Sequence, residues 1–128
     1  LGDVYKRQVS DCVYVKDVAK VFATAVEHTV RYGPTAKPVE VGPIESATVL
    51  DVAHLVAGTV SVKTGRPVVK IEHLPMRPGE VPNAVVKADT DTLKQIGMDA
   101  ADFVSLEAGI SDTVDYYSKN WLPGYKAV

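Results

Sequence analysis

The stretch Arg77-Pro78-Gly79-Glu80-Val81 holds the side chains best suited to binding a charged ligand. The guanidinium of Arg77 presents a planar fork of N–H donors, which matches phosphate oxygens in a way that a lysine ammonium cannot. Pro78 restricts the backbone of this loop, and Gly79 allows a ligand to approach the backbone closely. The alternative interpretation is that Arg77 and Glu80 form a solvated surface pair, as most Arg and Glu side chains do.

Other residue types with useful chemistry are present, but not at productive spacings. His28, His54 and His73 are widely separated and form no HExxH or Cys/His pattern, so the sequence predicts no metal site. We interpret Cys12 as a small apolar residue of a strand. Asp17 is interpreted as a first-turn acid that is favoured by the helix dipole, not as a catalytic acid.

The composition limits the classes of function that the chain can have. It has 128 residues, enough for one domain, and its hydrophobic content of 46% supports a core. A formal net charge of −2 provides no basic field for nucleic acid, so we expect no nucleic-acid partner. A single cysteine cannot form an internal disulfide, and no apolar run is long enough for a membrane span. We therefore expect a cytoplasmic protein without a membrane partner.

Two long segments have the periodicity of amphipathic helices, because apolar residues recur every three or four positions. The first apolar stripe comprises Val18, Val21, Phe22, Ala25, Val26 and Val30. The second comprises Val49, Val52, Ala53, Val56 and Val60. Glycine with a nearby proline is expected to end each helix, at Gly33-Pro34 and at Gly65-Arg66-Pro67.

Capping residues define the helix starts. Thr48 and Asp51 have the spacing of a capping box, with Asp in place of the commoner Glu. Asp89 is a plausible N-cap for a short helix that stops at Gly97, and Ser105 is expected to cap the last helix.

Between the helices, three β-branched segments are expected to form strands, at residues 12–15, 38–42 and 68–74. A loop with three prolines and one glycine follows the third of them. The predicted order is strand, helix, strand, helix, strand, loop, helix, helix, which is an α/β pattern with a helical end.

Residues 1–8 are interpreted separately from the rest of the chain. Asp3 to Gln8 read like one translated frame of a sequencing-adapter tag, so we expect a non-native leader at 1–8 and natural sequence at 9–128. The alternative is an ordinary mobile N-terminus.

Four local patterns, in this order, resemble the C-terminal part of extended short-chain dehydrogenase/reductases, the NAD-dependent nucleotide-sugar epimerase/dehydratase family. The family's Arg-Asp-aromatic stretch before Asp-Val-Ala is similar to Ser10–Ala19, and its last Rossmann strand and turn are similar to Val39–Ile44. Its Arg-Pro-Gly-Asp/Glu-Val loop is intact at Arg77–Val81, and its Ser-Leu-Glu-x-Gly pattern is similar to Ser105–Ile110.

The resemblance implies a fold and a function. The fold implied is a C-terminal fragment of a Rossmann-type α/β protein, with the smaller α/β substrate-binding subdomain. The function implied is to hold the nucleotide-diphosphate sugar of an NAD(P)-dependent epimerase, or alternatively of a 4,6-dehydratase or reductase. Arg77 is implied to bind the pyrophosphate and Glu80 the ribose, and the parent is implied to be a homodimer. A different reading of the chain is a free-standing, non-catalytic binding or interaction domain.

The family's catalytic apparatus has no counterpart in this sequence. The nine glycines include no GxxGxxG turn for the cofactor, and none of Tyr14, Tyr32, Tyr116 or Tyr117 is followed by lysine four residues on. We therefore expect no catalytic or cofactor-binding residue, no cofactor and no activity in this chain alone.

Two departures from the family pattern affect the expected site. Ser10 stands where many members have a second phosphate-binding Arg, and Glu40 replaces the usual Asn. Outside the site, strands and helices without their family neighbours are expected to leave an uncovered apolar patch that includes Phe22 and Val26.

Overall fold

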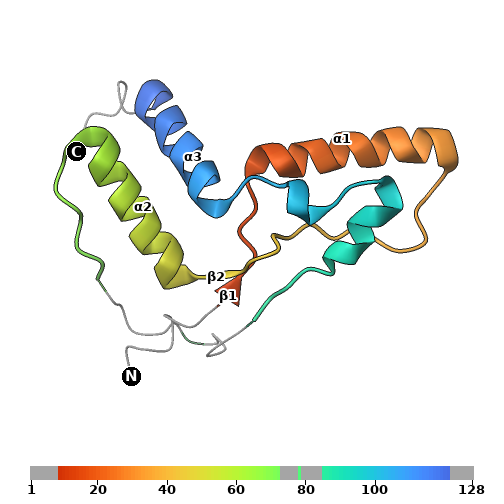
Figure 1. The fold of residues 1–128 in the computed structure, drawn as a ribbon, viewed down its shortest axis with the longest axis horizontal. Coiled ribbons are helices and arrows are strands. Elements are labelled where there is room, and N and C mark those ends of the chain that lie inside the picture. Colours follow the sequence, from red (N-terminus) through yellow and green to blue (C-terminus); the bar gives the residue numbers. More distant parts are fainter. Residues whose placement is uncertain (1–8, 73–77, 79–84, 122–128) are drawn as a thin grey trace.

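The computed structural model describes residues 9–72, 78 and 85–121. Within them the chain is mostly helical, and its strands are only two residues long. The elements in chain order are β1 (Val9–Ser10), α1 (Val15–Tyr32), β2 (Ala47–Thr48), α2 (Val49–Thr64), η2 (Thr90–Ile96), η3 (Ala100–Asp102) and α3 (Leu106–Asn120), where η denotes a 3₁₀ helix. Figure 1 shows α1 and η2 in one part of the molecule, and α2 beside α3 in the other.

The two long predicted helices are confirmed, together with the residues that end them. Gly33 has φ +88° and donates its N–H to the carbonyl of Thr29 at 3.0 Å, which stops α1. Gly65 has φ +68° in the left-handed region and stops α2. Both positions favour glycine, because an L side chain is strained at these backbone angles.

The capping box at the start of α2 is also confirmed. The backbone N–H of Asp51 donates to Thr48 Oγ1 at 3.1 Å, and the N–H of Thr48 donates to Asp51 Oδ2 at 3.0 Å. At the start of α3, Ser105 Oγ accepts from the N–H of Ala108 at 3.3 Å, as predicted.

The short predicted helix forms, but as a 3₁₀ helix. η2 follows Asp89 and ends at Gly97, as expected. The side chain of Asp89 makes no capping hydrogen bond; its backbone carbonyl instead accepts from Thr92 Oγ1 at 2.7 Å. The position of the helix was therefore correct, and the capping role of Asp89 was wrong.

The predicted strands are not confirmed. Residues 12–14, 38–42 and 68–72 have no regular secondary structure, Val15 begins α1, and residues 73–74 lie outside the described part. The only sheet among the described residues is the antiparallel pair β1–β2, with Val9 opposite Thr48 and Ser10 opposite Ala47. The described residues therefore do not form the expected Rossmann-type α/β sheet. Short β-branched segments become strands only where a neighbouring backbone pairs with them, and none of the described residues provides such a neighbour for these segments.

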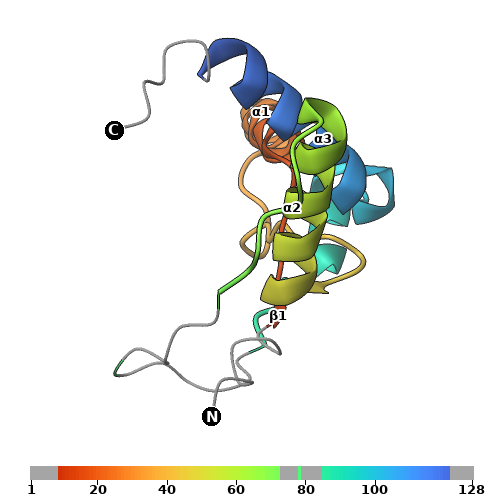
Figure 2. The same ribbon diagram turned by 90° about the vertical axis from the view of Figure 1, so that its left-hand side faces the viewer.

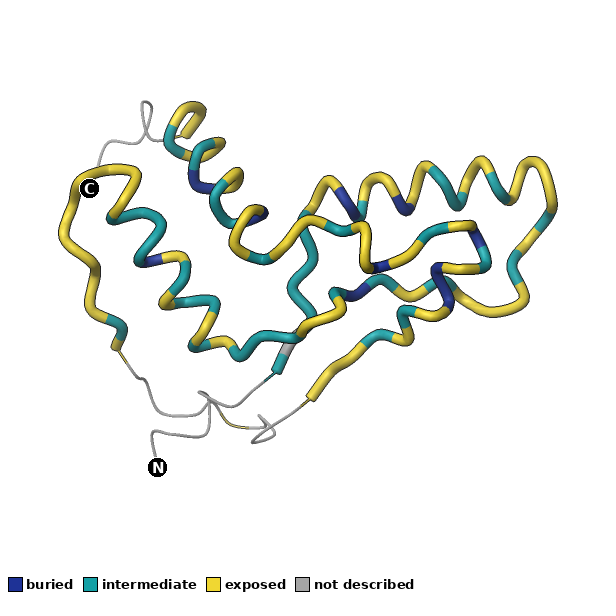
Figure 3. The backbone as a smooth tube through the Cα atoms, in the orientation of Figure 1, coloured by how far each residue is buried: buried dark blue, intermediate teal, exposed yellow. Residues whose placement is uncertain are grey.

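The core lies between α1 and η2. Val21, Leu93, Ile96 and Ala100 are buried together, and Leu93 is completely inaccessible. Val39 and Val41 pack against this cluster although they are not in a strand. Figure 3 shows that most of the remaining described backbone is exposed or only half-buried.

The helices α2 and α3 pack side by side, and this arrangement is visible in both Figure 1 and Figure 2. Their contact buries Ala57 of α2, and Gly109 and Val114 are the buried residues of α3. Within the described ranges, no helix is both long enough and apolar enough to cross a membrane.

Candidate functional site

The two predicted substrate-binding residues, Arg77 and Glu80, lie outside the described residues. The chain that follows their loop is described, and it is held next to β1. Val85 forms a parallel bridge with Val9, and the N–H of Val86 donates to the carbonyl of Val9 at 3.3 Å. Val85 and Val86 therefore lie beside Val9, which precedes Ser10, the position where the resemblance implies a second phosphate ligand.

Asp11 joins three distant parts of the sequence at this point. Its Oδ2 accepts a hydrogen bond from the N–H of Ala88 at 2.6 Å, and its Oδ1 accepts one from Ser46 Oγ at 3.1 Å. These contacts link the segment before α1 to the segment before α2 and to the chain that follows the Arg77 loop. A carboxylate with N–H and O–H donors makes stronger hydrogen bonds than a neutral acceptor would.

Gly42 makes this junction possible by its lack of a side chain. A Cβ atom at this position would lie 2.8 Å from Asp11 Oδ2 and 2.8 Å from the Cβ of Ala88. Both distances are far shorter than a normal van der Waals contact, so Gly42 allows the backbone to approach Asp11 closely. Gly42 belongs to the segment that resembles the family's last Rossmann strand and turn.

An open groove of about 570 Å³ adjoins this junction. Its lining contains both apolar and polar side chains, and no Lys or Arg is among its described lining residues. The lining includes Cys12, Ile44, Glu45, Ser46, His54, Phe103 and Glu107. A phosphate bound here would need its positive partner from elsewhere, because Glu45 and Glu107 are themselves acidic.

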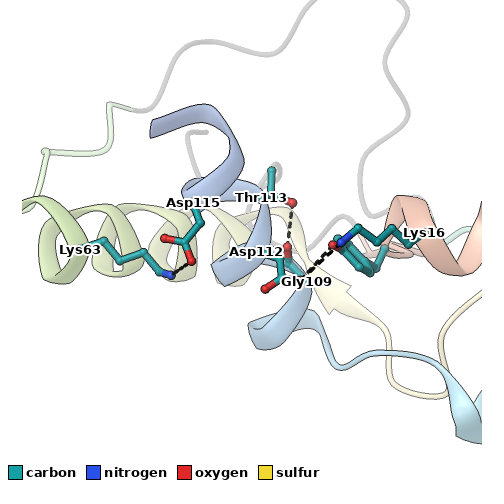
Figure 4. A network of polar contacts seen from close by, with 7 residues as sticks. Lys16, Lys63, Gly109, Asp112, Thr113 and Asp115 are labelled. Atoms are coloured by element: carbon teal, nitrogen blue, oxygen red, sulfur yellow. Dashed lines mark hydrogen bonds and ion pairs between the residues drawn. The ribbon is translucent and has the colours of Figure 1, made fainter. Parts of the chain in front are cut away.

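A second, larger groove of about 860 Å³ runs along α3. Tyr14 donates its hydroxyl to Asp112 Oδ2 at 3.1 Å, and the ammonium of Lys16 lies 4.0 Å from the same oxygen. Gly109 lets α3 approach the ring of Tyr14, since a Cβ there would lie 3.2 Å from that ring. Figure 4 shows this contact between the start of α1 and α3. These polar groups hold two elements together.

Farther along α3, Asp115 pairs with Lys63 of α2 at 2.7 Å, as Figure 4 also shows. The hydrogen bond from Lys63 lowers the pKa of the Asp115 carboxyl from its ordinary value. The pair ties the C-terminal part of α2 to α3.

Asp17 was predicted to be a first-turn acid of α1, and it lies there. The structure adds a contact that the sequence did not indicate, because Asp17 is buried and its Oδ2 accepts from the N–H of Val104 at 2.9 Å. This bond fixes the chain that leads into α3. Asp17 is therefore a structural acceptor as well as a helix-dipole partner.

The helix starts do not fit a dinucleotide cofactor. Such a cofactor needs free N–H groups at a glycine-rich strand-to-helix turn. The turn before α1 is Asp11-Cys12-Val13-Tyr14, which has no glycine, and the N-terminus of α2 is occupied by the Thr48–Asp51 box. The first turn of α1 also carries the negative charge of Asp17. The starts of α1 and α2 therefore offer no site for the pyrophosphate of a dinucleotide.

The described residues contain no group of three or more His, Cys, Asp or Glu side chains that is placed to hold a metal ion. His54 lines the smaller groove, the ring of His28 lies 5.1 Å from that of Tyr32 in a tilted arrangement, and His73 lies outside the described part. Cys12 is a half-buried free cysteine in the connection between β1 and α1, not in a strand as predicted.

No family model matches this chain, and no curated protein or solved structure is significantly similar to it. The likeness to the epimerase/dehydratase family rests on the four sequence patterns.

Sequence analysis missed three residues that organise this region, namely Asp11, Gly42 and Asp112. Asp11 and Gly42 lie within the patterns that carry the resemblance, but their partners are far away in the chain. The bond from Ala88 to Asp11 spans 77 positions, and the bond from Tyr14 to Asp112 spans 98. Periodicity and capping rules act over a few residues, so neither contact has a local signal.

Proposed function

We propose that this chain is the substrate-binding part of a longer NAD(P)-dependent nucleotide-sugar epimerase. In this proposal Arg77 holds the diphosphate of the sugar nucleotide, and Glu80 accepts hydrogen bonds from its ribose. The rest of the longer protein supplies the cofactor site and the proton-transferring residues.

The observation that carries the proposal is the junction at Asp11. Two of the four patterns that resemble the family meet there, because Asp11 belongs to the first and Gly42 to the second; Ala88, which donates to Asp11, belongs to none of the four. Patterns that matched a family by chance would have no reason to converge on one carboxylate. In this proposal the Arg77 loop, which precedes Val85 in the chain, supplies the phosphate ligand.

The groove next to the junction suits the uncharged part of such a ligand. Its apolar stretches offer surface to a base or sugar ring, and Ser46, Glu45 and Glu107 offer hydrogen-bond partners to hydroxyl groups. Since its described lining has no cation, the diphosphate depends on Arg77. A remote handle of this kind positions the reacting end of a substrate as well as binding it.

The proposal also includes the fold of the longer protein. Residues 12–15 and 38–42 are expected to become strands of a Rossmann-type sheet when the neighbouring strands are present, because their β-branched composition is typical of strands that are covered on both faces. Oxidation and reduction of the sugar belong to the cofactor, and this chain binds and orients the substrate. The chain alone is expected to be inactive.

Calorimetry on the 128-residue chain tests the proposal. A panel of nucleoside diphosphate sugars and NAD would be titrated into the chain and into its Arg77→Ala and Arg77→Lys variants. We expect binding of at least one sugar nucleotide and none of NAD. A hydrogen bond with a charged group contributes about 1.5–3 kcal/mol, so Arg77→Ala should weaken binding about ten- to a hundredfold. Arg77→Lys should recover only part of the loss, because it keeps the charge without the fork.

Arg66→Ala is the matched control, because Arg66 is an exposed arginine in the turn after α2. It should leave sugar-nucleotide affinity unchanged. If no sugar nucleotide binds, or if Arg77→Ala and Arg66→Ala bind equally well, the proposal is wrong. Binding of NAD by the wild-type chain would also contradict it. A folded chain that binds none of these ligands would favour the free-standing interaction domain.

A further inference from the structure

The charged groups that line the smaller groove all carry the same sign. Glu45, Asp51 and Glu107 contribute carboxylates, which accept hydrogen bonds but cannot donate them when ionised. The described lining contains no Lys or Arg to balance them. The groove is therefore a negatively charged surface that is rich in acceptors, and this pattern discriminates among the ligands that could occupy it.

Ser46 adds a further acceptor, because its only hydroxyl proton is already used. Ser46 Oγ donates to Asp11 Oδ1 at 3.1 Å, while Asp11 Oδ2 accepts from the N–H of Ala88 at 2.6 Å. A serine hydroxyl has one proton and two lone pairs, so Ser46 offers only lone pairs to a ligand in the groove. Asp11 thereby fixes the hydrogen-bonding polarity of a residue that lines the groove.

The helix starts beside the groove do not supply the missing positive charge. The N-terminus of a helix attracts anions, and both α2 and α3 begin at this groove. Each start has its own acid, since Asp51 lies in the first turn of α2 and Glu107 in the first turn of α3. Both dipoles are therefore offset within the protein. Ser105 and His54 are lining side chains that can still donate, and neither has a fixed positive charge.

We propose that this groove holds the hexose of the sugar nucleotide and selects a hexose without a carboxylate, with Asp11 and Ser46 as specificity-determining residues. This inference rests on the proposed function and adds the class of sugar. A hexose presents hydroxyl donors around its ring, which suit acceptors on several sides, and Ile44 and Phe103 offer apolar surface to its C–H groups. A nucleobase is recognised through donors and acceptors together, so it fits this lining less well.

A uronic acid carries a carboxylate in place of the C6 hydroxyl of the hexose. That carboxylate is ionised at neutral pH and only accepts hydrogen bonds, so it would meet other carboxylates and the lone pairs of Ser46. Removing it from water without a cation or a sufficient set of donors is unfavourable. The groove should therefore reject a uronic acid and accept the corresponding neutral hexose.

Calorimetry with matched ligand pairs tests this selectivity on the 128-residue chain. The pairs are UDP-glucose with UDP-glucuronic acid and GDP-mannose with GDP-mannuronic acid, and the members of each pair differ only at C6. We expect the neutral member to bind at least about tenfold more tightly. The preference should become smaller in about 1 M salt, because the groove is open to water and its charges are then screened.

Charge removal in the groove shows which residues cause the preference. Glu45→Gln and Glu107→Gln each replace a carboxylate by an amide that can donate, so each should lower the preference about threefold, mainly through tighter binding of the uronic acid. Glu27→Gln is the matched control on α1, the helix whose Phe22 and Val26 are uncovered as expected. It removes the same charge from an exposed position away from the groove and should leave the preference unchanged.

Asp11→Asn tests the role of Ser46. The amide oxygen can still accept from the N–H of Ala88, and the amide N–H can donate to Ser46 Oγ, which frees the hydroxyl proton of Ser46 for a ligand. The preference for the neutral hexose should fall about threefold, with unchanged helicity by circular dichroism. In a Ser46→Ala chain the same substitution should have a smaller effect, because the hydroxyl that changes polarity is absent. An equal fall in both backgrounds would contradict the role given to Ser46.

The outcomes separate this inference from the function on which it rests. If a neutral sugar nucleotide binds and Arg77→Ala weakens it, but the uronic acid binds equally well, the proposed function stands and the selectivity is wrong. Equal effects of Glu27→Gln and the two groove variants would also overturn the selectivity. If neither neutral sugar nucleotide binds, the inference fails together with the proposed function.

Discussion

The half of the molecule around α1 and η2 buries its apolar side chains more completely than the half formed by α2 and α3. Around α1 and η2, apolar side chains from several segments converge, and Leu93 is completely enclosed. Between α2 and α3 only one pair of helices meets, and Ala57 is the only residue of α2 that is buried. The half around α1 and η2 therefore has a small hydrophobic core, whereas α2 and α3 only contact each other along one side.

This difference in burial is not explained by how apolar the two long helices are. α2 is the more apolar helix, with Val, Leu and Ala on nearly all sides, yet most of its side chains are half-buried or exposed. α1 is less apolar but has its apolar residues on one side, and that side meets η2. A helix that is apolar all round is typical of a fully buried position. The composition of α2 is therefore typical of a helix with more neighbours than the described residues provide.

Two hydrogen bonds connect the halves at the start of α1. Asp17 accepts from the N–H of Val104, just before α3, and Tyr14 donates to Asp112 on α3. Asp17 is buried, whereas the bond from Tyr14 is exposed. The bond of Asp17 is part-buried and therefore less open to water than the bond of Tyr14, so it should contribute more to the coupling between the halves.

The largest effect is expected from Leu93→Ala, in the core half. Truncation of a fully buried leucine leaves a cavity and typically costs about 2–5 kcal/mol, which is a large part of the stability of a small domain. Hydrogen exchange should show faster exchange in α1 and η2, with a much smaller change in α2. Val62→Ala removes an exposed side chain of α2 and should have almost no effect. Equal protection losses in α1 and α2 would show that the halves unfold as one unit.

The next largest effect is expected from Asp17→Ala, at the connection between the halves. The substitution leaves the N–H of Val104 without its acceptor, and because this bond is only part-buried and Val104 is 40% exposed, we expect a cost at the lower end of about 1–3 kcal/mol. Asp17→Asn keeps a side-chain oxygen and should retain part of the stability. We expect the thermal unfolding of α3 to separate from that of α1 in Asp17→Ala. If both variants melt like the wild type, the bond does not couple the halves.

A smaller effect is expected from Thr48→Ala, at the start of α2. Loss of an N-cap side chain costs about 1 kcal/mol, and here the loss should appear as fraying of the first turn of α2. Hydrogen bonds from the side chain and then the backbone of Thr48 lower the pKa of Asp51 below 3.8. A lowered folded pKa stabilises the fold above the unfolded value, and this contribution is lost as the pH falls through the folded pKa.

An NMR titration of the Asp51 carboxyl checks this prediction. In Thr48→Ala its pKa should rise toward 3.8, and acid should destabilise α2 less steeply than in the wild type. Ser105→Ala removes the corresponding cap of α3 and should leave the titration of Asp51 unchanged. An unchanged Asp51 titration in Thr48→Ala would mean that the box does not persist in solution.

The elements that the sequence predicted correctly depend on local interactions. The capping box at Thr48, the cap at Ser105 and the stops at Gly33, Gly65 and Gly97 involve residues at most a few positions apart. The strands failed because pairing depends on a neighbouring backbone, which no local pattern provides. Dependence on distant residues also explains why only part of the candidate site was predicted. The Arg77 loop was predicted from residue types and lies outside the described residues, whereas Asp11, which was not predicted, has partners 35 and 77 positions away.

The smallest effect is expected at Lys63 and Asp115, which join α2 to α3 at 2.7 Å. Both side chains remain partly open to water, so the attraction is screened and the cost of removing it is low. Lys63→Met keeps most of the aliphatic stem and should lower the melting temperature of the α2–α3 half less than Thr48→Ala does. The difference in melting temperature between Lys63→Met and the wild type should become smaller in about 1 M salt, because charges are then screened over about 3 Å.

The pH dependence of the same pair gives an independent measurement. The hydrogen bond from Lys63 lowers the pKa of Asp115, so the contribution of the pair is present above 3.8 and lost as the pH falls through the folded pKa. Lys63→Met should therefore lower the stability of the α2–α3 contact most near neutral pH and hardly at all in acid. The pair of Lys94 with Asp91 at 2.6 Å lies within η2 and is a matched control, because Lys94→Met should not alter the exchange of amides in α2. If Lys63→Met lowers the melting temperature by the same amount at every salt concentration, the stabilisation comes instead from packing of the lysine stem against α3.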